Sequence, residues 1–129
     1  MLDHVGFAVS DAERSRRFYE TALVPLGITL IMTVGPEHTE SGGTAHGFGS
    51  DGKPYFWFGD KECVGEGSHI AFAAGTRREV DAFYESALAA GGRDNGAPGL
   101  RPQYHPDYYG AFVFDPDGMN IEAMCHKPE

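Results

Sequence analysis

An internal repeat constrains the fold of this chain more than any other feature of its sequence. The segment FYETALVPLG, which begins at Phe18, returns as FYESALAAGG at Phe83, 65 positions later. The same offset relates His4 to His69, and it relates six pairs inside the two segments: Phe18/Phe83, Tyr19/Tyr84, Glu20/Glu85, Ala22/Ala87, Leu23/Leu88 and Gly27/Gly92. Self-similarity over half of a chain indicates two copies of one structural unit. Because 129 residues suit one compact domain, we predict a single domain, 1–129, built from repeats at about 1–62 and 66–129.

The first copy predicts the element order βαβββ. Large apolar residues near its start alternate with small or polar ones, the period-two pattern of a strand with two different faces: Val5, Phe7 and Val9. Ser10 and Glu13 are spaced as a capping box, and apolar residues then recur at helical spacing as far as Gly27. Three runs rich in branched and aromatic residues predict strands at 28–34, 44–49 and 54–59.

The second copy repeats this order. A strand is expected at 68–74, and Thr76 with Glu79 forms a second capping box before a helix that ends near Gly91. The irregular stretch 93–109 contains at most one weak strand, and a hairpin with its turn at Asp117-Gly118 closes the copy. The class is therefore α+β. A sheet with one helix leaves its second face open, so we expect the open faces of the two copies to meet around a cleft that holds the functional site.

Composition excludes several classes of partner. Ten Lys and Arg residues against 19 Asp and Glu residues give a net charge of -9 without a like-charge run, which argues against nucleic acid. No apolar run approaches 18 residues and no leader is visible, so we expect a cytoplasmic protein that does not enter a membrane. Two cysteines, Cys63 and Cys125, are too few for a disulfide framework and are predicted to be reduced thiols.

Three side chains that suit metal coordination are predicted to face the cleft. His4 and His69 lie at equivalent points in the first strands of the two copies, and Glu122 lies in the last strand with its neighbours turned toward the helix. Aligning the two hairpins on their Asp-Gly steps, Asp51-Gly52 and Asp117-Gly118, shifts the offset by one. This alignment places Phe56 opposite Glu122 in the repeat.

The repeat and three of its motifs resemble a known superfamily. DHVGFAVSD, HIAF and DPDGMNIE are similar to segments of the vicinal oxygen chelate superfamily, which includes glyoxalase I, fosfomycin-resistance proteins, methylmalonyl-CoA epimerase, extradiol dioxygenases and bleomycin-resistance proteins. The segment YHPDYYGAFVFDPDGMNIEA is similar to small bacterial glyoxalase-like proteins. The resemblance implies the paired-module glyoxalase/bleomycin-resistance/dioxygenase fold, with metal ligands at His4, His69 and Glu122. The fourth ligand of glyoxalase I does not transfer, because Phe56 stands at its predicted position.

The resemblance also implies a function. Two imidazoles and one carboxylate leave coordination positions open on one divalent ion per site, and they suit Fe, Mn, Zn, Ni or Co. Such an ion polarises neighbouring oxygens of a small substrate as a Lewis acid, and iron could instead activate dioxygen. We therefore expect a metal-dependent lyase, isomerase, epimerase, thiol transferase or dioxygenase. The alternatives are a metal-free protein that binds a small molecule or drug, as bleomycin-resistance proteins do, and a sensor or partner subunit with a vestigial site.

Other residues are predicted to complete the cleft. The segment YHPDYYG precedes the last hairpin, where it could cover the cleft, and Tyr109 and His105 are the predicted acid or base. Surface aromatic packing is the alternative for this segment. Tyr104, Phe56 and Phe58 are predicted to line the substrate site, although the run Phe56, Trp57 and Phe58 fits the core better than a pocket. Small family members commonly pair copy one of one chain with copy two of another, so we expect a homodimer.

Overall fold

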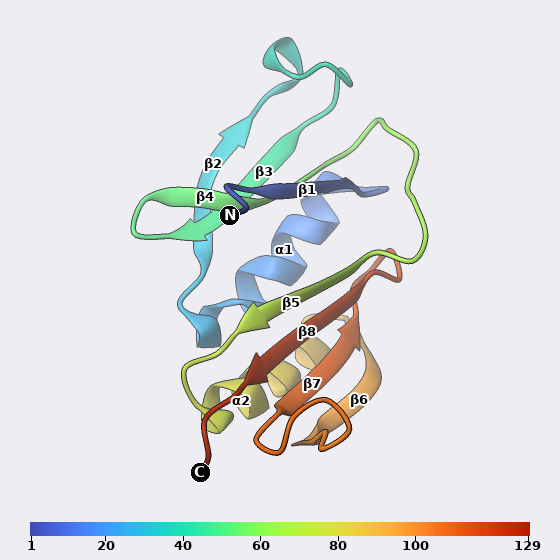
Figure 1. The fold of residues 1–129 in the computed structure, drawn as a ribbon. Helices are drawn as coiled ribbons and strands as arrows, with labels where there is room; N and C mark the ends of the chain where they lie inside the picture. The colour runs from blue at the N-terminus through green and yellow to red at the C-terminus, as the bar shows by residue number, and fades with distance from the viewer.

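The computed structural model describes all residues, 1–129, and contains two four-stranded sheets and two α-helices (Figure 1). The elements of the first repeat are β1 (Val5–Ala8), α1 (Ala12–Ala22), η1 (Val24–Leu26), β2 (Thr29–Val34), η2 (Pro36–His38), β3 (Ala45–Ser50) and β4 (Lys53–Gly59). Those of the second are β5 (His69–Ala73), α2 (Arg77–Ala89), β6 (Arg93–Leu100), β7 (Tyr109–Phe114) and β8 (Asn120–Cys125). The predicted α+β class and the order βαβββ in each copy are confirmed. The weak strand expected within 93–109 is β6, which is eight residues long.

The two sheets have the same topology. Their strand orders are β1-β4-β3-β2 and β5-β8-β7-β6, with the first strand of each repeat parallel to the last and the other pairs antiparallel. As a result β1 and β5 are both edge strands. Each has backbone groups on one side that no strand of this chain pairs with.

The two helices begin at different kinds of cap. Thr76 and Glu79 form the predicted capping box at α2. At α1 the cap is Asp11, whose side chain accepts a hydrogen bond from the backbone N–H of Arg14, so the predicted box at Ser10 is wrong. The Ser10 hydroxyl is engaged elsewhere, because it donates to Asp117 of the second repeat at 2.5 Å.

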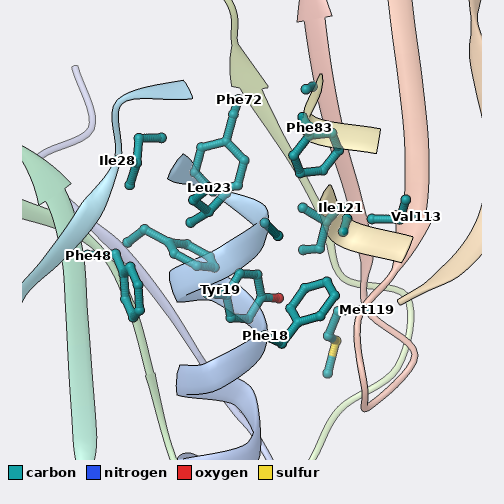
Figure 2. Packing of buried hydrophobic residues seen from close by; sticks show 14 of the residues in the cluster. Phe18, Tyr19, Leu23, Ile28, Phe48, Phe72, Phe83, Val113, Met119 and Ile121 are labelled. Atoms are coloured by element: carbon teal, nitrogen blue, oxygen red, sulfur yellow. The ribbon is translucent and has the colours of Figure 1, made fainter. Parts of the chain in front are cut away.

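One hydrophobic core joins the two repeats. Helix α1 packs against α2, and both helices lie behind the sheets in Figure 1. The core contains 20 buried residues drawn from both repeats, and Figure 2 shows side chains of both in a single cluster. The rings of Phe56 and Phe72, one from each repeat, meet edge to face with centroids 5.1 Å apart. The helix-covered faces therefore meet within the chain, so the two open faces do not close on each other within it.

A buried hydrogen-bond cluster also connects the repeats. The Tyr19 hydroxyl on α1 donates to Asp115 in the turn between β7 and β8 at 2.6 Å. The other oxygen of Asp115 accepts from the backbone N–H groups of Asp117 and Met119, each at 2.9 Å. Burial raises the pKa of the Asp115 carboxyl, and burial next to this carboxyl raises the pKa of Tyr19 well above its usual value. The DPDG segment therefore fixes the last hairpin of copy two against the helix of copy one.

The repeat supplies a matched test of this cluster. Tyr19 and Tyr84 are equivalent and each donates to an aspartate, but Tyr19 is buried whereas the bond from Tyr84 to Asp94 is exposed. Tyr19→Phe leaves Asp115 without its only side-chain donor, and we expect it to lower the free energy of unfolding by about 1–3 kcal/mol. Tyr84→Phe should change stability little. Urea unfolding of both variants makes the comparison, and equal losses would contradict the role of Tyr19.

Candidate metal centre

A histidine and a glutamate meet on the open face of the second sheet. Strands β5 and β8 pair in the register His69↔Asn120 and Ala71↔Glu122, so the side chains of His69 and Glu122 share one face. His69 Nε2 lies 2.9 Å from Glu122 Oε2. The Glu122 side chain is only 2% exposed, whereas the His69 side chain is 47% exposed. The predicted pair is therefore present, with the imidazole between the buried carboxylate and the surface.

The second oxygen of Glu122 accepts a hydrogen bond from Tyr108. The Tyr108 hydroxyl donates to Oε1, and the absence of a side chain at Gly110 allows this approach. A Cβ atom at Gly110 would lie 3.2 Å from both Glu122 Oε1 and Tyr108 Cε1. Burial is the main cause that raises the pKa of Tyr108, and the hydrogen bond to Glu122 raises it further. The hydroxyl is thus a proton donor at neutral pH, and it fixes the orientation of the carboxylate.

Of the two residues predicted as acid or base, Tyr109 lies outside this site. It pairs with Cys125 on the helix-covered face of the sheet, and its hydroxyl donates to Asp81 of α2 at 2.7 Å. The hydrogen bond to Asp81, with burial, raises the pKa of Tyr109 to about 12. The prediction that Tyr109 faces the cleft is therefore wrong. Its neighbour Tyr108 points to the opposite face and contacts Glu122 instead.

The rest of the aromatic segment packs around Tyr108. The Tyr104 and Tyr108 rings meet with centroids 5.2 Å apart, and the His126 ring lies 5.2 Å from the Tyr108 ring. His105 is exposed, contacts the His126 ring, and accepts a hydrogen bond from the backbone N–H of Asp107 at Nδ1. The segment thus covers one end of the Glu122 site through Tyr108, while His105 points to other partners.

His4 lies apart from the other two predicted ligands. It precedes β1 on the first sheet, its side chain is 61% exposed, and its Nδ1 lies 2.8 Å from Asp3, which also binds Lys53. His4 lines a groove of about 370 Å³ between β1 and β5 whose other lining residues are mostly apolar. No group of three or more His, Cys, Asp and Glu side chains within the chain is arranged to hold a metal ion. One chain therefore brings together His69 and Glu122 but leaves His4 separate.

Phe56 and Phe58 belong to the core. Both are 1% exposed, and their ring centroids lie 5.0 and 5.1 Å from that of Tyr19 on α1. The prediction that they share the face of Glu122 is wrong. Phe56 also lines the groove between β1 and β5.

The hairpin turns explain this error. Asp51 and Gly52 form a two-residue turn in which both residues have positive φ, whereas only Gly118 has positive φ in the five-residue connection from β7 to β8. The two Asp-Gly steps are therefore not structurally equivalent. In the strands themselves Gly6 pairs with Trp57 and Ala71 pairs with Glu122, so the offset of 65 holds and Trp57 is the counterpart of Glu122.

Trp57 lies on the open face of the first sheet. Its ring covers Gly47, where a Cβ atom would come within 2.6 Å of it, and its Cβ lies beside Gly6. Next to the ring is a hollow of about 360 Å³ whose strand residues are mostly small and whose rim includes Glu40 and Glu62. An aromatic face thus occupies the position where the resemblance to glyoxalase I implies a fourth ligand.

Two glutamate substitutions test this assignment. Loss of the buried Phe56 ring alone lowers the free energy of unfolding by about 3–5 kcal/mol. Phe56→Glu also buries a carboxylate, so it should lower this free energy by at least that amount, and added metal should not restore the lost stability. Trp57→Glu places a carboxylate on the half-exposed open face, so it should cost less and should tighten Zn(II) or Ni(II) binding by adding an oxygen ligand. Thermal unfolding with and without each metal distinguishes them. If metal restored the thermal stability of Phe56→Glu and did not stabilise Trp57→Glu, then Phe56 and not Trp57 would be the counterpart of Glu122.

Comparison with known proteins identifies the family. A model of the Glyoxalase/Bleomycin resistance protein/Dioxygenase superfamily matches residues 1–123, and the chain belongs to this superfamily. The structure is similar to that of a glyoxalase/bleomycin resistance protein from Albidiferax ferrireducens T118, with 31% identity, a TM-score of 0.74 and 99% of each chain covered. It is also similar to the V278E mutant of glyoxalase I from Zea mays, with 25% identity and a TM-score of 0.72, covering 95% of this chain and 45% of the plant enzyme.

A more distant structure shares the fold. A glyoxalase/bleomycin resistance protein/dioxygenase family enzyme from Burkholderia phytofirmans PsJN shares the fold, with 19% identity, a TM-score of 0.70, and 97% of this chain and 98% of that chain covered. No curated protein matches the sequence. None of the helices has the length and apolar character needed to span a membrane.

Proposed function

We propose that the protein is a divalent-metal-dependent enzyme that acts on a small substrate whose neighbouring oxygens bind the metal. The observation that supports this most directly is the 2.9 Å approach of His69 Nε2 to Glu122 Oε2 on an uncovered sheet face. A neutral imidazole nitrogen and a carboxylate oxygen are suitable ligands for Fe, Mn, Co, Ni or Zn. The reaction belongs to one of five classes: lyase, isomerase, epimerase, thiol transferase or dioxygenase.

The third ligand in this proposal is His4 of a second copy of the chain. The helix-covered faces are already buried against each other, so each open face is available to another molecule. Edge strands β1 and β5 each have one side that no strand pairs with. Two large apolar residues are also exposed at the first open face: Leu2 near it (85% exposed) and Met32 on it (49% exposed). A homodimer that places the first sheet of one chain over the second sheet of its partner covers these surfaces and forms two equivalent clefts.

The residues of the chain then have distinct tasks. A metal bound by His4, His69 and Glu122 supplies Lewis-acid chemistry to the substrate oxygens. Tyr108 holds one carboxylate oxygen of Glu122, leaving Oε2 directed toward His69. Asp3 contacts Nδ1 of His4 and thereby leaves Nε2 as the nitrogen available to the ion, the arrangement by which a carboxylate orients a ligating imidazole. Trp57 presents an apolar face from the first sheet and excludes water there.

Metal titration tests the proposed function. We expect the wild-type protein to bind one divalent ion per chain, and Tyr108→Phe, which disturbs only a supporting hydrogen bond, to weaken binding about tenfold. His4→Ala, His69→Ala and Glu122→Ala remove direct ligands and should each weaken it further. His38→Ala, an exposed histidine in η2, is the control and should bind as the wild type does. Calorimetry with Mn(II), Zn(II) and Ni(II) provides the affinities.

A metal-free binding protein is the second candidate. The hollow beside Trp57, with Glu40 and Glu62 at its rim, and the net charge of -9 favour a planar cationic ligand. The same titration separates the two functions. If the wild type and the His4, His69 and Glu122 variants bind all three metals equally weakly, the enzyme proposal falls and the binding-protein function replaces it.

A further inference from the structure

Two arginines without acidic partners lie on the open face of the second sheet. Arg14, Arg16, Arg17 and Arg77 each form an ion pair with a carboxylate, whereas Arg78 on α2 forms none. Arg93 and Arg101 form none, although the chain contains 19 acidic residues against ten basic ones. Each instead lies over a phenylalanine of β7, Arg93 over Phe114 and Arg101 over Phe112. Positive charge is thus left unneutralised on one face of an acidic protein.

The guanidinium of Arg101 is held in place but mostly unpaired. Its Cζ atom lies 5.4 Å from the centroid of the Phe112 ring, and one Nη2–H donates to the carbonyl of Ala97 at 2.8 Å. A Cβ atom at Gly96 or Gly99 would lie 3.2 Å from a guanidinium nitrogen, so the two glycines let the side chain lie close to β6. Only one of the five N–H donors of a guanidinium has a protein acceptor here.

Arg101 also lies close to the candidate metal centre. Phe112, which supports it, pairs directly with Glu122 in the sheet, and the Phe112 and His69 ring centroids are 6.1 Å apart. The free guanidinium and the His69 ring therefore neighbour the same aromatic ring. A fixed guanidinium with free, forked donors matches the geometry of carboxylate and phosphate oxygens.

We propose that Arg101 is a specificity-determining residue that binds an anionic group, a carboxylate or a phosphate, of a substrate whose reacting oxygens lie at the His69–Glu122 centre. The assignment of the reacting oxygens rests on the proposed function. The anionic group is a separate part of the substrate, because Arg101 follows β6 and His69 lies on β5, the strands at the two edges of this sheet. In a chain of net charge -9, this local positive charge offsets the repulsion that an anionic substrate otherwise meets.

Arg93 provides a matched control. Its Cζ atom lies 5.1 Å from the centroid of the Phe114 ring, so its stacking is the same as that of Arg101. Phe114, however, pairs with Asn120, two residues along β8 from Glu122. Arg93 therefore has the same chemistry on a ring whose partner in β8 is Asn120 and not Glu122. Replacing either arginine by glutamine removes one charge and keeps an N–H donor.

The test measures discrimination between anionic and neutral probes of similar shape. Benzoate, phenylphosphonate and benzamide are titrated into the full-length protein, loaded with Zn(II) or held in EDTA, and dissociation constants are obtained from NMR shifts. Since hydrogen bonds to charged groups are strong, we expect the wild type to bind at least one anion about tenfold more tightly than benzamide under both conditions. Benzoate and phenylphosphonate identify whether a carboxylate or a phosphate is preferred.

The variants decide whether Arg101 causes this discrimination. Arg101→Gln should bring the ratio of anion to benzamide affinity to about one, and Arg93→Gln should leave it unchanged. A purely structural role of Arg101 would weaken all three probes together and keep the ratio. The inference is overturned if the wild type shows no anion preference, or binds none of the probes, or if the preference survives Arg101→Gln. The measurement in EDTA needs no metal. If the protein binds no metal, the proposed enzyme function falls, but the anion preference of Arg101 is still tested separately.

Discussion

The arrangement of this protein depends on burial of the two helix-covered sheet faces against each other. Phe56 from the first repeat meets Phe72 from the second, and α1 packs on α2, so the apolar sides of both repeats form one core. The buried bond from Tyr19 to Asp115 adds a directional contact between the same two halves. Because the apolar area is used inside the chain, both open faces stay uncovered, and one of them holds the His69–Glu122 pair.

The candidate site follows from this division of the sheet faces. Glu122 is buried on an open face and is hydrogen-bonded through both oxygens, to His69 and to Tyr108, which fixes its orientation. His4 lies on the other sheet with a separate carboxylate partner, Asp3. We propose that each open face is half of a cleft and that a second copy of the chain supplies the other half.

Much of this structure could be predicted from the sequence, since the repeat and strand periodicity are local signals. The offset of 65 predicted two βαβββ units, and strand parity correctly placed His69 and Glu122 on one face. The predictions failed where the chain departs from its own repeat. Different turns in the two hairpins misplaced Phe56, and the side of the sheet that Tyr109 faces depends on a pairing with Cys125 that periodicity does not supply. Contacts over long sequence distances, such as that between Tyr19 and Asp115, were also beyond reach.

The claim that the cleft is shared between two chains can be measured by mixing subunits. The His4→Ala chain keeps His69 and Glu122, and the Glu122→Ala chain keeps His4, so each homodimer lacks one ligand at every site. A heterodimer of the two, purified through two different tags, contains one complete site if the ligands come from different chains. The account predicts that this heterodimer binds one Zn(II) ion with wild-type affinity. A heterodimer that binds as weakly as both parents, or a protein that stays monomeric at micromolar concentration, would contradict it.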